Sequence, residues 1–235
     1  MKVHVLGCHG PYPTAGGATS GYLLTQNGEK ILMDCGSGVL SKLLLLTDPA
    51  SLSAILLSHL HFDHAEDLLV MSYLLQMRGR KLTVYVPPED NSPLKALLSP
   101  QVYDVRPYPE EMDIAGIRIT TCPTRHPVPC RAIRLEAEGK SLVFTGDTNT
   151  CEGLKGFCRG ADALLCDAAF LDSEWKETLP HLSALKAAQL AGEAQVKKLY
   201  LTHLPVTHDM KTMEKEAALA FAQTRAVYPG MEIIL

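Results

Sequence analysis

The 235-residue sequence predicts a layered α/β protein in which sheet packs on sheet and helices lie outside. Short β-rich segments alternate with helix-like segments along the whole chain. Each half of the chain opens with a run of strands, and helices follow. No internal repeat, low-complexity tract or long Gly/Ser linker interrupts this order, so we expect one domain spanning residues 1–235.

The first half of the chain contains short apolar strands and two helices. Asn27-Gly28 between two apolar runs is typical of a tight hairpin turn. The strands are expected at Lys2–Leu6, Gly21–Thr25, Lys30–Asp34, Leu52–Leu57 and Lys81–Val86, and the helices at Val39–Leu46 and Ala65–Met77. The second helix is expected to pack its apolar side chains in the core, namely Met71, Leu74, Leu75 and Met77.

The second half begins with strands of alternating polarity. The segment Asp113–Thr121 places Ile114, Ile117 and Ile119 among polar neighbours, which predicts one strand, and Gly139 predicts a turn between two later strands. The other strands are expected at Arg131–Glu136, Ser141–Thr145, Ala163–Cys166, Lys198–Thr202 and Glu232–Leu235, and the helices at Ser183–Ala194 and Met213–Gln223.

Composition and charge exclude several classes of protein. Apolar residues make up 46% of the chain, and 22 Lys+Arg against 26 Asp+Glu give a formal charge of −4, which is not the composition of a disordered chain. The longest aliphatic run is Leu43–Leu46, far short of the roughly 20 residues of a membrane span, and the N-terminus lacks a signal-peptide pattern. We therefore expect a cytoplasmic protein with no membrane partner and no large nucleic-acid surface.

The seven cysteines do not predict a disulfide framework, because they are odd in number and scattered. The spacing of Cys151 and Cys158 also matches no zinc-binding pair. We expect reduced cysteines that serve as small buried hydrophobic residues.

The sharpest local signal is the segment Ser58–His64, with the sequence SHLHFDH, at the end of an apolar strand and before a helix. Residues two apart in an extended segment point to the same side, so His59 and His61 can share one metal ion. The chain then turns, and Asp63 and His64 can reach a neighbouring point. Such a motif is expected by chance in well under about one chain per thousand, so it predicts a metal site.

Three further candidate ligands each follow a predicted strand. They are His126, Asp147 in Gly-Asp-Thr, and His203 in Leu-Thr-His. Because the carboxyl ends of strands commonly meet at one edge of a sheet, we expect these side chains to lie near the histidine motif.

Together these motifs resemble those of the metallo-β-lactamase-fold hydrolases, and the resemblance covers essentially the whole chain. It implies an αββα sandwich and two metal ions about 3.5–4 Å apart with a shared water or hydroxide. Zn²⁺ is the expected metal, with Mn²⁺ and Fe as alternatives. The resemblance assigns one metal to His59, His61 and His126, the second to Asp63, His64 and His203, and the bridge between them to Asp147.

The segment Asp34–Gly38 resembles the early Asp-x-Gly turn of the same superfamily, whose aspartate supports the site from behind. The bridging Asp147 is absent from true β-lactamases of this fold. The surroundings of His126 lack the glycine that precedes the corresponding histidine in glyoxalase-like thioesterases. Only 21 positions separate His126 from Asp147, which leaves no room for the arm that tRNA 3′-endonucleases insert there. Small phosphodiesters remain as expected substrates: cyclic nucleotides, cyclic phosphoribosyl compounds or short oligonucleotides.

The segment Pro180–Ala184, with the sequence PHLSA, begins a predicted helix and resembles the His-Ser/Glu-Thr-Ala box of the phosphodiesterase and tRNA-processing branch. In that branch this histidine contacts the scissile phosphate or protonates the leaving oxygen. The expected mechanism is attack on phosphorus by a hydroxide held between the metals. Asp63 would orient the hydroxide while serving as a ligand, and His181 would donate the proton.

Other functions remain as alternatives. The fold also hosts thioester and lactone hydrolases and non-hydrolytic redox or metal-carrying proteins, although redox relatives usually carry a flavin domain that 235 residues cannot include. A degenerate binding module is disfavoured by the complete set of seven ligands. The phosphodiesterase relatives suggest a homodimer and a small anionic substrate.

A few polar residues near these motifs have weaker signals. We expect His9 on the surface, His208 beside the site or on the surface, and Arg78 and Arg80 at a solvated helix end. At most one of Arg131 and Arg134 can point to the site, because residues three apart on a strand face opposite sides.

Overall fold

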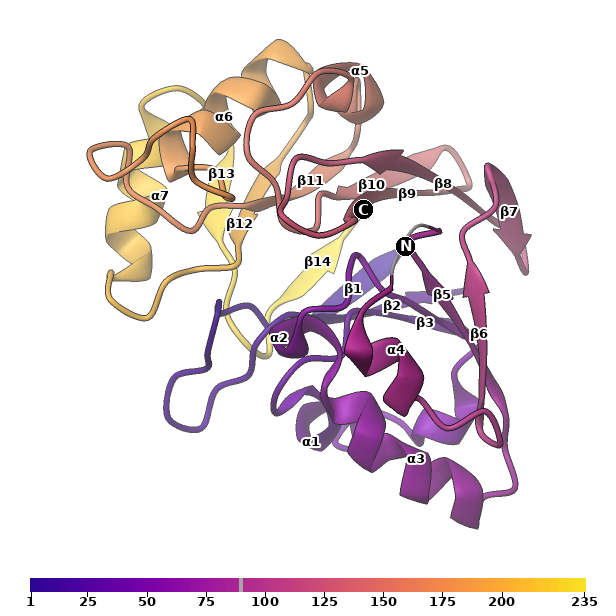
Figure 1. Cartoon of the computed structure of the whole chain (residues 1–235). Helices are drawn as coiled ribbons and strands as arrows, with labels where there is room; N and C mark the ends of the chain where they lie inside the picture. The colour runs from indigo at the N-terminus through magenta and orange to yellow at the C-terminus, as the bar shows by residue number, and fades with distance from the viewer. Residues whose placement is uncertain (89–90) are drawn as a thin grey trace. The chain divides into compact units, whose positions relative to one another are not determined.

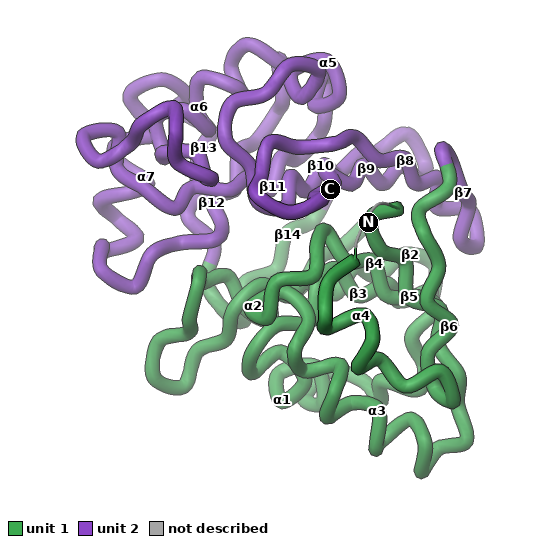
Figure 2. The backbone as a smooth tube through the Cα atoms, in the orientation of Figure 1, with its two compact units in different colours: residues 1–109, 228–234 green, residues 110–227, 235 purple. Residues whose placement is uncertain are grey.

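The structure is a computed structural model that describes residues 1–88 and 91–235. The chain forms two compact units, drawn in two colours in Figure 2. Unit 1 comprises Met1–Pro109 and Tyr228–Ile234, and unit 2 comprises Glu110–Val227 and Leu235. The expectation of one domain spanning residues 1–235 stays a prediction.

Unit 1 contains a seven-stranded mixed sheet (Figure 1). The strand order is β14 (Glu232–Ile234), β1 (Lys2–Gly7), β2 (Gly21–Gln26), β3 (Glu29–Met33), β4 (Ala54–Leu56), β5 (Leu82–Val86) and β6 (Tyr103–Pro107). The strands from β14 to β3 pair antiparallel, and those from β3 to β6 pair parallel. The helices are α1 (Val39–Leu43), α2 (Phe62–Ala65), α3 (Asp67–Met77) and α4 (Pro93–Leu97), with a 3₁₀ turn at Pro49–Ser51.

Local sequence explains the elements of unit 1. Asn27 and Gly28 have φ of 52° and 87°, as a two-residue hairpin turn with right-handed strand twist requires, and the predicted β2–β3 hairpin is confirmed. The core of the unit joins Leu32 and Ile55 from the sheet to Met71 and Leu75 from α3, and all four side chains are fully buried. The apolar side chains of the sheet pack against α3, and this packing holds in place the end of β4, after which the histidine motif follows.

Unit 2 contains a second seven-stranded mixed sheet. The strand order is β13 (Thr224–Ala226), β12 (Leu199–Thr202), β11 (Ala163–Asp167), β10 (Lys140–Phe144), β9 (Arg131–Ala137), β8 (Ile117–Pro123) and β7 (Glu111–Ile114). The strands from β7 to β10 pair antiparallel, and those from β10 to β13 pair parallel. The helices are α5 (Leu154–Cys158), α6 (Ala184–Glu193) and α7 (Met210–Ala218).

Helix α6 is an alanine-rich helix packed in the core of unit 2. Ser183 caps its N-terminus by accepting a hydrogen bond from Lys186 N at 3.0 Å. Its buried face consists of small residues at helical spacing, namely Ala184, Ala187, Ala188 and Ala191. This cap fixes the residue at which α6 begins, three positions after His181.

Both sheets use the same arrangement at the carboxyl ends of their parallel strands. In unit 1, Asp34 follows β3, and the histidine motif begins three residues after β4. In unit 2, Asp147 follows β10, Asp167 is the last residue of β11, and His203 follows β12 directly. Parallel strands that end side by side bring these polar residues together within each unit.

The expectation of a single strand at Asp113–Thr121 was wrong. The structure has a hairpin there, with Ala115 and Gly116 at φ of 52° and 85° in the turn between β7 and β8. Asp113 Oδ1 accepts a hydrogen bond from Gly116 N at 2.8 Å. The odd spacing between Ile114 and Ile117 breaks the period of two, and this break marks the turn.

Helix α3 is the second place where the expectation and the structure differ. Met71 and Leu75 are buried and Leu74 is partly buried, but Met77 is 87% exposed, so its predicted core position was wrong. Met77 is the last residue of α3, where the helix leaves the core. The predicted helix Met213–Gln223 instead runs over Met210–Ala218, and β6, β13, α4 and α5 were not predicted because each is only three to five residues long.

The cysteines agree with the expectation of reduced thiols. None of the seven, all of which the structure describes, forms a disulfide, and five are buried. Burial raises the pKa of Cys8 and of Cys158 to about 12, so both thiols are neutral near pH 7. Among the helices of the described residues, none combines the length and apolar character needed to cross a membrane.

Candidate metal centre

The histidine motif of unit 1 places two imidazole rings side by side. The chain is extended through His61, which has φ −70° and ψ 154° and directly precedes α2. His59 Nε2 and His61 Nδ1 lie 3.0 Å apart. Tetrahedral zinc with nitrogen ligands at about 2.0–2.1 Å holds two nitrogens roughly 3.3 Å apart. The two rings therefore fit adjacent ligands of one metal ion.

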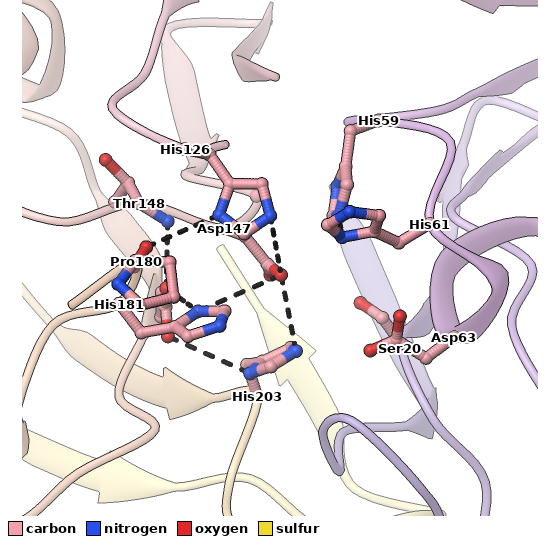
Figure 3. A network of polar contacts seen from close by, with 12 residues as sticks. Ser20, His59, His61, Asp63, His126, Asp147, Thr148, Pro180, His181 and His203 are labelled. Carbon is pink, nitrogen blue, oxygen red and sulfur yellow. Dashed lines mark hydrogen bonds and ion pairs between the residues drawn. The ribbon is translucent and has the colours of Figure 1, made fainter. Parts of the chain in front are cut away.

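The other two residues of the motif lie in the first turn of α2. Asp63 Oδ2 lies 3.5 Å from His64 Nε2, and the ring centroids of His59 and His64 are 4.1 Å apart. We call His59, His61, Asp63 and His64 the unit 1 cluster; the first three are labelled in Figure 3. Its donors are nitrogen and oxygen, the ligand types that zinc and similar metals accept.

Asp34 is a buried carboxylate that orients two of these histidines. Its Oδ1 accepts a hydrogen bond from Ser58 N at 2.7 Å, and its Oδ2 accepts from Ser58 Oγ at 2.9 Å and from His64 Nδ1 at 2.6 Å. Ser58 Oγ donates to Asp34 and so accepts from His59 Nδ1, 3.1 Å away. Both rings then carry their proton on Nδ1, which leaves the Nε2 lone pair of each available to a metal.

We expect Asp34→Asn to weaken metal binding by about 10- to 100-fold, because an amide has only one accepting oxygen, whereas both carboxylate oxygens of Asp34 accept hydrogen bonds from Ser58 or His64. Competition with a chromophoric chelator measures this affinity. The matched control is Asp48→Asn, an exposed aspartate that accepts from Ala50 N. Equal affinity in the two variants would contradict the orienting role of Asp34.

Gly36 allows the loop after Asp34 to lie against α2. Cys35 N donates to His64 O at 2.7 Å, and Gly36 N donates to Ser20 O at 3.0 Å. A Cβ atom on residue 36 would overlap the Asp63 carbonyl oxygen and the Thr19 hydroxyl. The loop that carries Asp34 and the turn that carries Asp63 therefore need a glycine at this point.

Gly36→Ala is expected to lower the free energy of unfolding by about 3 kcal/mol or more, because the atoms it overlaps include backbone that cannot move aside cheaply. Urea denaturation measures the change. Gly156→Ala in α5 is the control: nothing lies within 4 Å of its added Cβ, so the same substitution should change stability by less than about 1 kcal/mol. Similar losses in both variants would refute the close-contact explanation.

Unit 2 holds a second cluster, which consists of His126, Asp147, His181 and His203 and is drawn in Figure 3. Asp147 Oδ2 lies 3.3 Å from His203 Nε2, 3.9 Å from His126 Nε2 and 3.8 Å from His181 Nδ1. Asp147 and His203 are buried. A buried carboxylate surrounded by imidazoles at these distances fits a shared cation.

Asp167 is a functional candidate that sequence reasoning missed. This fully buried carboxylate accepts hydrogen bonds from Thr148 N at 2.8 Å and from His181 Nδ1 at 2.9 Å, and its Oδ1 lies 4.0 Å from His203 Nδ1. It therefore supports the unit 2 cluster as Asp34 supports the unit 1 cluster. Its position at the end of an apolar strand predicts a site residue by the same rule that applies to Asp147 and His203.

His181 differs from the other two histidines of its cluster in the nitrogen that it presents. His126 and His203 turn Nε2 toward Asp147, and His126 Nδ1 lies 3.4 Å from the Pro180 carbonyl. His181 instead turns Nδ1 toward Asp147, and that nitrogen donates its proton to Asp167. Although the ligand atoms of Asp147, His181 and His203 lie within 4.8 Å of one another, a protonated nitrogen cannot bind a metal.

Backbone strain occurs in the unit 2 cluster and at Asp34, which supports the unit 1 cluster. Asp34 and His203 have φ of 56° and 53°, in the left-handed region that non-glycine residues seldom adopt. Each follows the last residue of a parallel strand, where the chain turns sharply. Such strain is typical of functional sites, where the surrounding structure holds a side chain in a required direction.

The residues with weaker signals have structural partners. The expectation that His9 lies on the surface was wrong, since it is 7% exposed and burial lowers its pKa. Arg78 pairs with Asp48 at 2.9 Å at an exposed helix end, as expected. Arg134 donates to the carbonyls of Phe157 and Arg159, and His208 pairs with Glu174. Arg80 is exposed and Arg131 is partly buried.

Comparison with known proteins identifies the family. The family described as "Beta-lactamase superfamily domain" matches residues 29–204. The chain is 33% identical over 229 residues to the probable metallo-hydrolase YhfI of Bacillus subtilis, covering 94% of each chain. It is 31% identical over 239 residues to a ribonuclease Z of Mycobacterium bovis, covering 86% of this chain and 85% of that protein.

The fold is also that of a solved structure. The crystal structure of the metallo-β-lactamase-fold protein YhfI from Bacillus subtilis superposes with a TM-score of 0.94 at 30% identity, covering 99% of this chain and 98% of that one. The metallo-β-lactamase fold implied by the resemblance of the combined motifs is confirmed. The chain therefore belongs to the β-lactamase superfamily, as a metallo-hydrolase with the metallo-β-lactamase fold and with His/Asp clusters able to hold metal.

Proposed function

We propose that this protein is a dinuclear-metal phosphodiesterase that hydrolyses small phosphodiesters. The observation that carries the proposal is the Asp167–His181 pair, a histidine held at 2.9 Å by a buried carboxylate beside the candidate ligands. A thioester releases a thiolate, which departs without a proton, so its hydrolysis needs only the metals and a nucleophile. A phosphodiester with an alkoxide leaving group also needs a proton donor, and His181 supplies that additional group.

The two clusters would together supply the seven ligands. In this proposal His59, His61 and His126 hold one metal, Asp63, His64 and His203 hold the other, and Asp147 bridges them. The nitrogen spacing of 3.0 Å in unit 1 and the carboxylate–imidazole distances of 3.3–3.9 Å in unit 2 support it. When bound, the metals, most simply zinc, would supply Lewis-acid stabilisation of the phosphoryl oxygens and a water of lowered pKa.

The residues of the chain would then perform the remaining steps. Asp63, a candidate ligand, would also orient the attacking water. Asp167 holds the His181 ring by its Nδ1 proton, so that Nε2 is the nitrogen that can carry a second proton. The negative charge of Asp167 stabilises the imidazolium that results. His181 would protonate the departing oxygen from Nε2, and Thr148 N, the other donor to Asp167, keeps that carboxylate in place.

Two facts support a small substrate rather than a folded RNA. The formal charge of −4 provides no excess of cationic residues for a long phosphate backbone. The alignment to the ribonuclease Z relative extends over 239 positions while covering 86% of this 235-residue chain, so the relative carries residues that this chain lacks. The expected homodimer and cytoplasmic location remain parts of this proposal.

The testing experiment is hydrolysis of bis(p-nitrophenyl) phosphate by protein of measured metal content, in parallel with a thioester and a lactone. We expect turnover of the phosphodiester that rises with metal content up to about two ions per chain. Metal-loaded protein that hydrolyses only the thioester or the lactone would overturn the phosphodiesterase proposal. Hydrolysis of the thioester alone would also leave His181 without its proposed role.

A further inference from the structure

The segment just before His181 has little core packing of its own. The side chains of Lys176, Glu177 and Thr178 are exposed, and Leu179 and Pro180 are only partly buried. The position of this segment therefore depends on its backbone contacts. Leu179 N donates to Lys176 O within the segment at 3.0 Å, which tightens the turn but does not attach it to the rest of unit 2.

Asn149 attaches this turn. Its side chain is fully buried, and its Nδ2 donates to Leu179 O at 2.6 Å, with Lys176 O and Glu177 O at 3.3 and 3.4 Å. Its Oδ1 accepts from Thr150 N at 2.6 Å, which fixes the orientation of the amide. One buried NH₂ group thus faces three carbonyl oxygens of the segment that leads to His181.

The backbone of Asn149 belongs to the segment that carries Asp147. Asn149 N donates to Arg125 O at 2.9 Å, next to His126. Thr124 Oγ1 donates to the Asp147 carbonyl at 2.9 Å. Through its backbone and its side chain, Asn149 therefore connects the segments that carry three members of the unit 2 cluster. Two other side chains also link these segments. His126 Nδ1 lies 3.4 Å from the Pro180 carbonyl, and Arg125 Nη1 lies 3.7 Å from Glu177 Oε1, but neither faces three carbonyls as the buried Asn149 amide does.

We propose that Asn149 is a positioning residue that sets where His181 lies relative to Asp147, an inference that rests on the proposed role of His181. The direct contacts of His181 act on its ring through Asp167 and on its carbonyl through Trp175 Nε1 at 3.1 Å. Neither contact fixes the turn before it. A displacement of about 1 Å at a catalytic group can cost on the order of 100-fold in rate, so the anchoring of this turn affects turnover.

The variant that isolates this role is Asn149→Asp. It keeps the size of the side chain and the oxygen that accepts from Thr150 N, but it replaces the NH₂ donor by an oxygen that repels three carbonyls. Asn149→Ser, whose hydroxyl is one bond too short to reach the three carbonyls of the turn, is the second variant in case the aspartate impairs folding. Asn27→Asp in the exposed β2–β3 turn makes the same chemical change away from the cluster and serves as the control.

The first measurement is the ¹H–¹⁵N spectrum of the His181 imidazole in zinc-loaded protein, which needs no substrate. We expect the Nδ1–H signal, bonded to Asp167, to shift or broaden in Asn149→Asp, with metal content unchanged and no change in Asn27→Asp. An identical His181 signal in folded Asn149→Asp or Asn149→Ser would overturn the proposal. This outcome does not depend on whether the protein hydrolyses phosphodiesters.

The second measurement is a double-mutant cycle with 3′,5′-cyclic AMP, whose leaving group is an alkoxide. Asn149→Asp should lower kcat by about 10- to 100-fold with little change in KM. In the His181→Ala background it should have almost no further effect, because both changes remove the same proton transfer. Multiplicative losses would refute an action through His181. Wild-type protein that hydrolyses no phosphodiester would reject the proposed function, while the spectrum still decides the role of Asn149.

Discussion

Asp147→Ala is expected to abolish phosphodiester hydrolysis, with a loss of roughly 10³-fold or more, and to lower the bound metal to about one ion per chain. The Asp147 carboxylate lies within 3.3–3.9 Å of nitrogens on His126, His181 and His203, so its removal leaves those imidazoles without their shared anion. Lewis-acid stabilisation is worth several kcal/mol, and each 1.36 kcal/mol corresponds to a factor of ten in rate.

The measurement combines elemental analysis with turnover of bis(p-nitrophenyl) phosphate on the same preparations. Asp209→Ala is the matched control, since Asp209 is exposed and makes no capping hydrogen bond at the start of α7. If Asp147→Ala retained both two metals and wild-type turnover, the bridging role would be wrong. If it lost activity but kept both metals, Asp147 would act on the substrate rather than on metal binding.

The rule that polar residues at the ends of strands mark a site accounts for what the sequence could predict. It indicates Asp147 and His203 from the sequence alone, without the parallel order of β10, β11 and β12. Applied consistently, it would also have identified Asp167, which ends β11. A single aspartate has no spacing motif, however, and nothing in its neighbours indicates that it faces His181, fourteen residues later, rather than solvent.

Other features could not be predicted from periodicity because they depend on contacts distant in sequence. Asn149 follows the recognised Gly-Asp-Thr segment, but its function depends on a turn about thirty residues later. The tautomers of His59 and His64 follow from Asp34, which is separated from His64 by thirty positions. The resemblance indicated that Asp34 supports the site, and the hydrogen bonds supply the physical reason.

The two clusters also show why each unit needs a buried carboxylate. An imidazole can ligate a metal or donate a proton, depending on which nitrogen carries the hydrogen. Asp34 accepts a hydrogen bond from Nδ1 of His64 and, through Ser58, keeps the proton of His59 on Nδ1 as well, and so favours ligation by Nε2. Asp167 accepts the corresponding hydrogen bond from His181 Nδ1. In His181, however, Nδ1 is also the nitrogen nearest Asp147, so the proton on Nδ1 excludes His181 from the metal ligands.

His181→Ala is therefore expected to lower turnover by about 10²- to 10⁴-fold on a phosphodiester with an alkoxide leaving group, while the metal content stays unchanged. The leaving group makes the test specific. An alkoxide departs slowly without a proton, whereas p-nitrophenolate is stable as an anion. The loss on bis(p-nitrophenyl) phosphate should accordingly be much smaller, less than about tenfold. His208→Ala, which removes a partly buried histidine paired with Glu174, should affect neither substrate.

The ratio of the two losses separates proton donation from every other role of His181. A ligand role would remove metal and reduce both rates equally. A role in binding the phosphate would raise KM for both substrates without regard to the leaving group. Proton donation alone predicts that the loss grows as the leaving oxygen becomes more basic. Asp167→Asn should show the same dependence in weaker form, since it keeps an acceptor for His181 Nδ1 but removes the charge that stabilises the imidazolium.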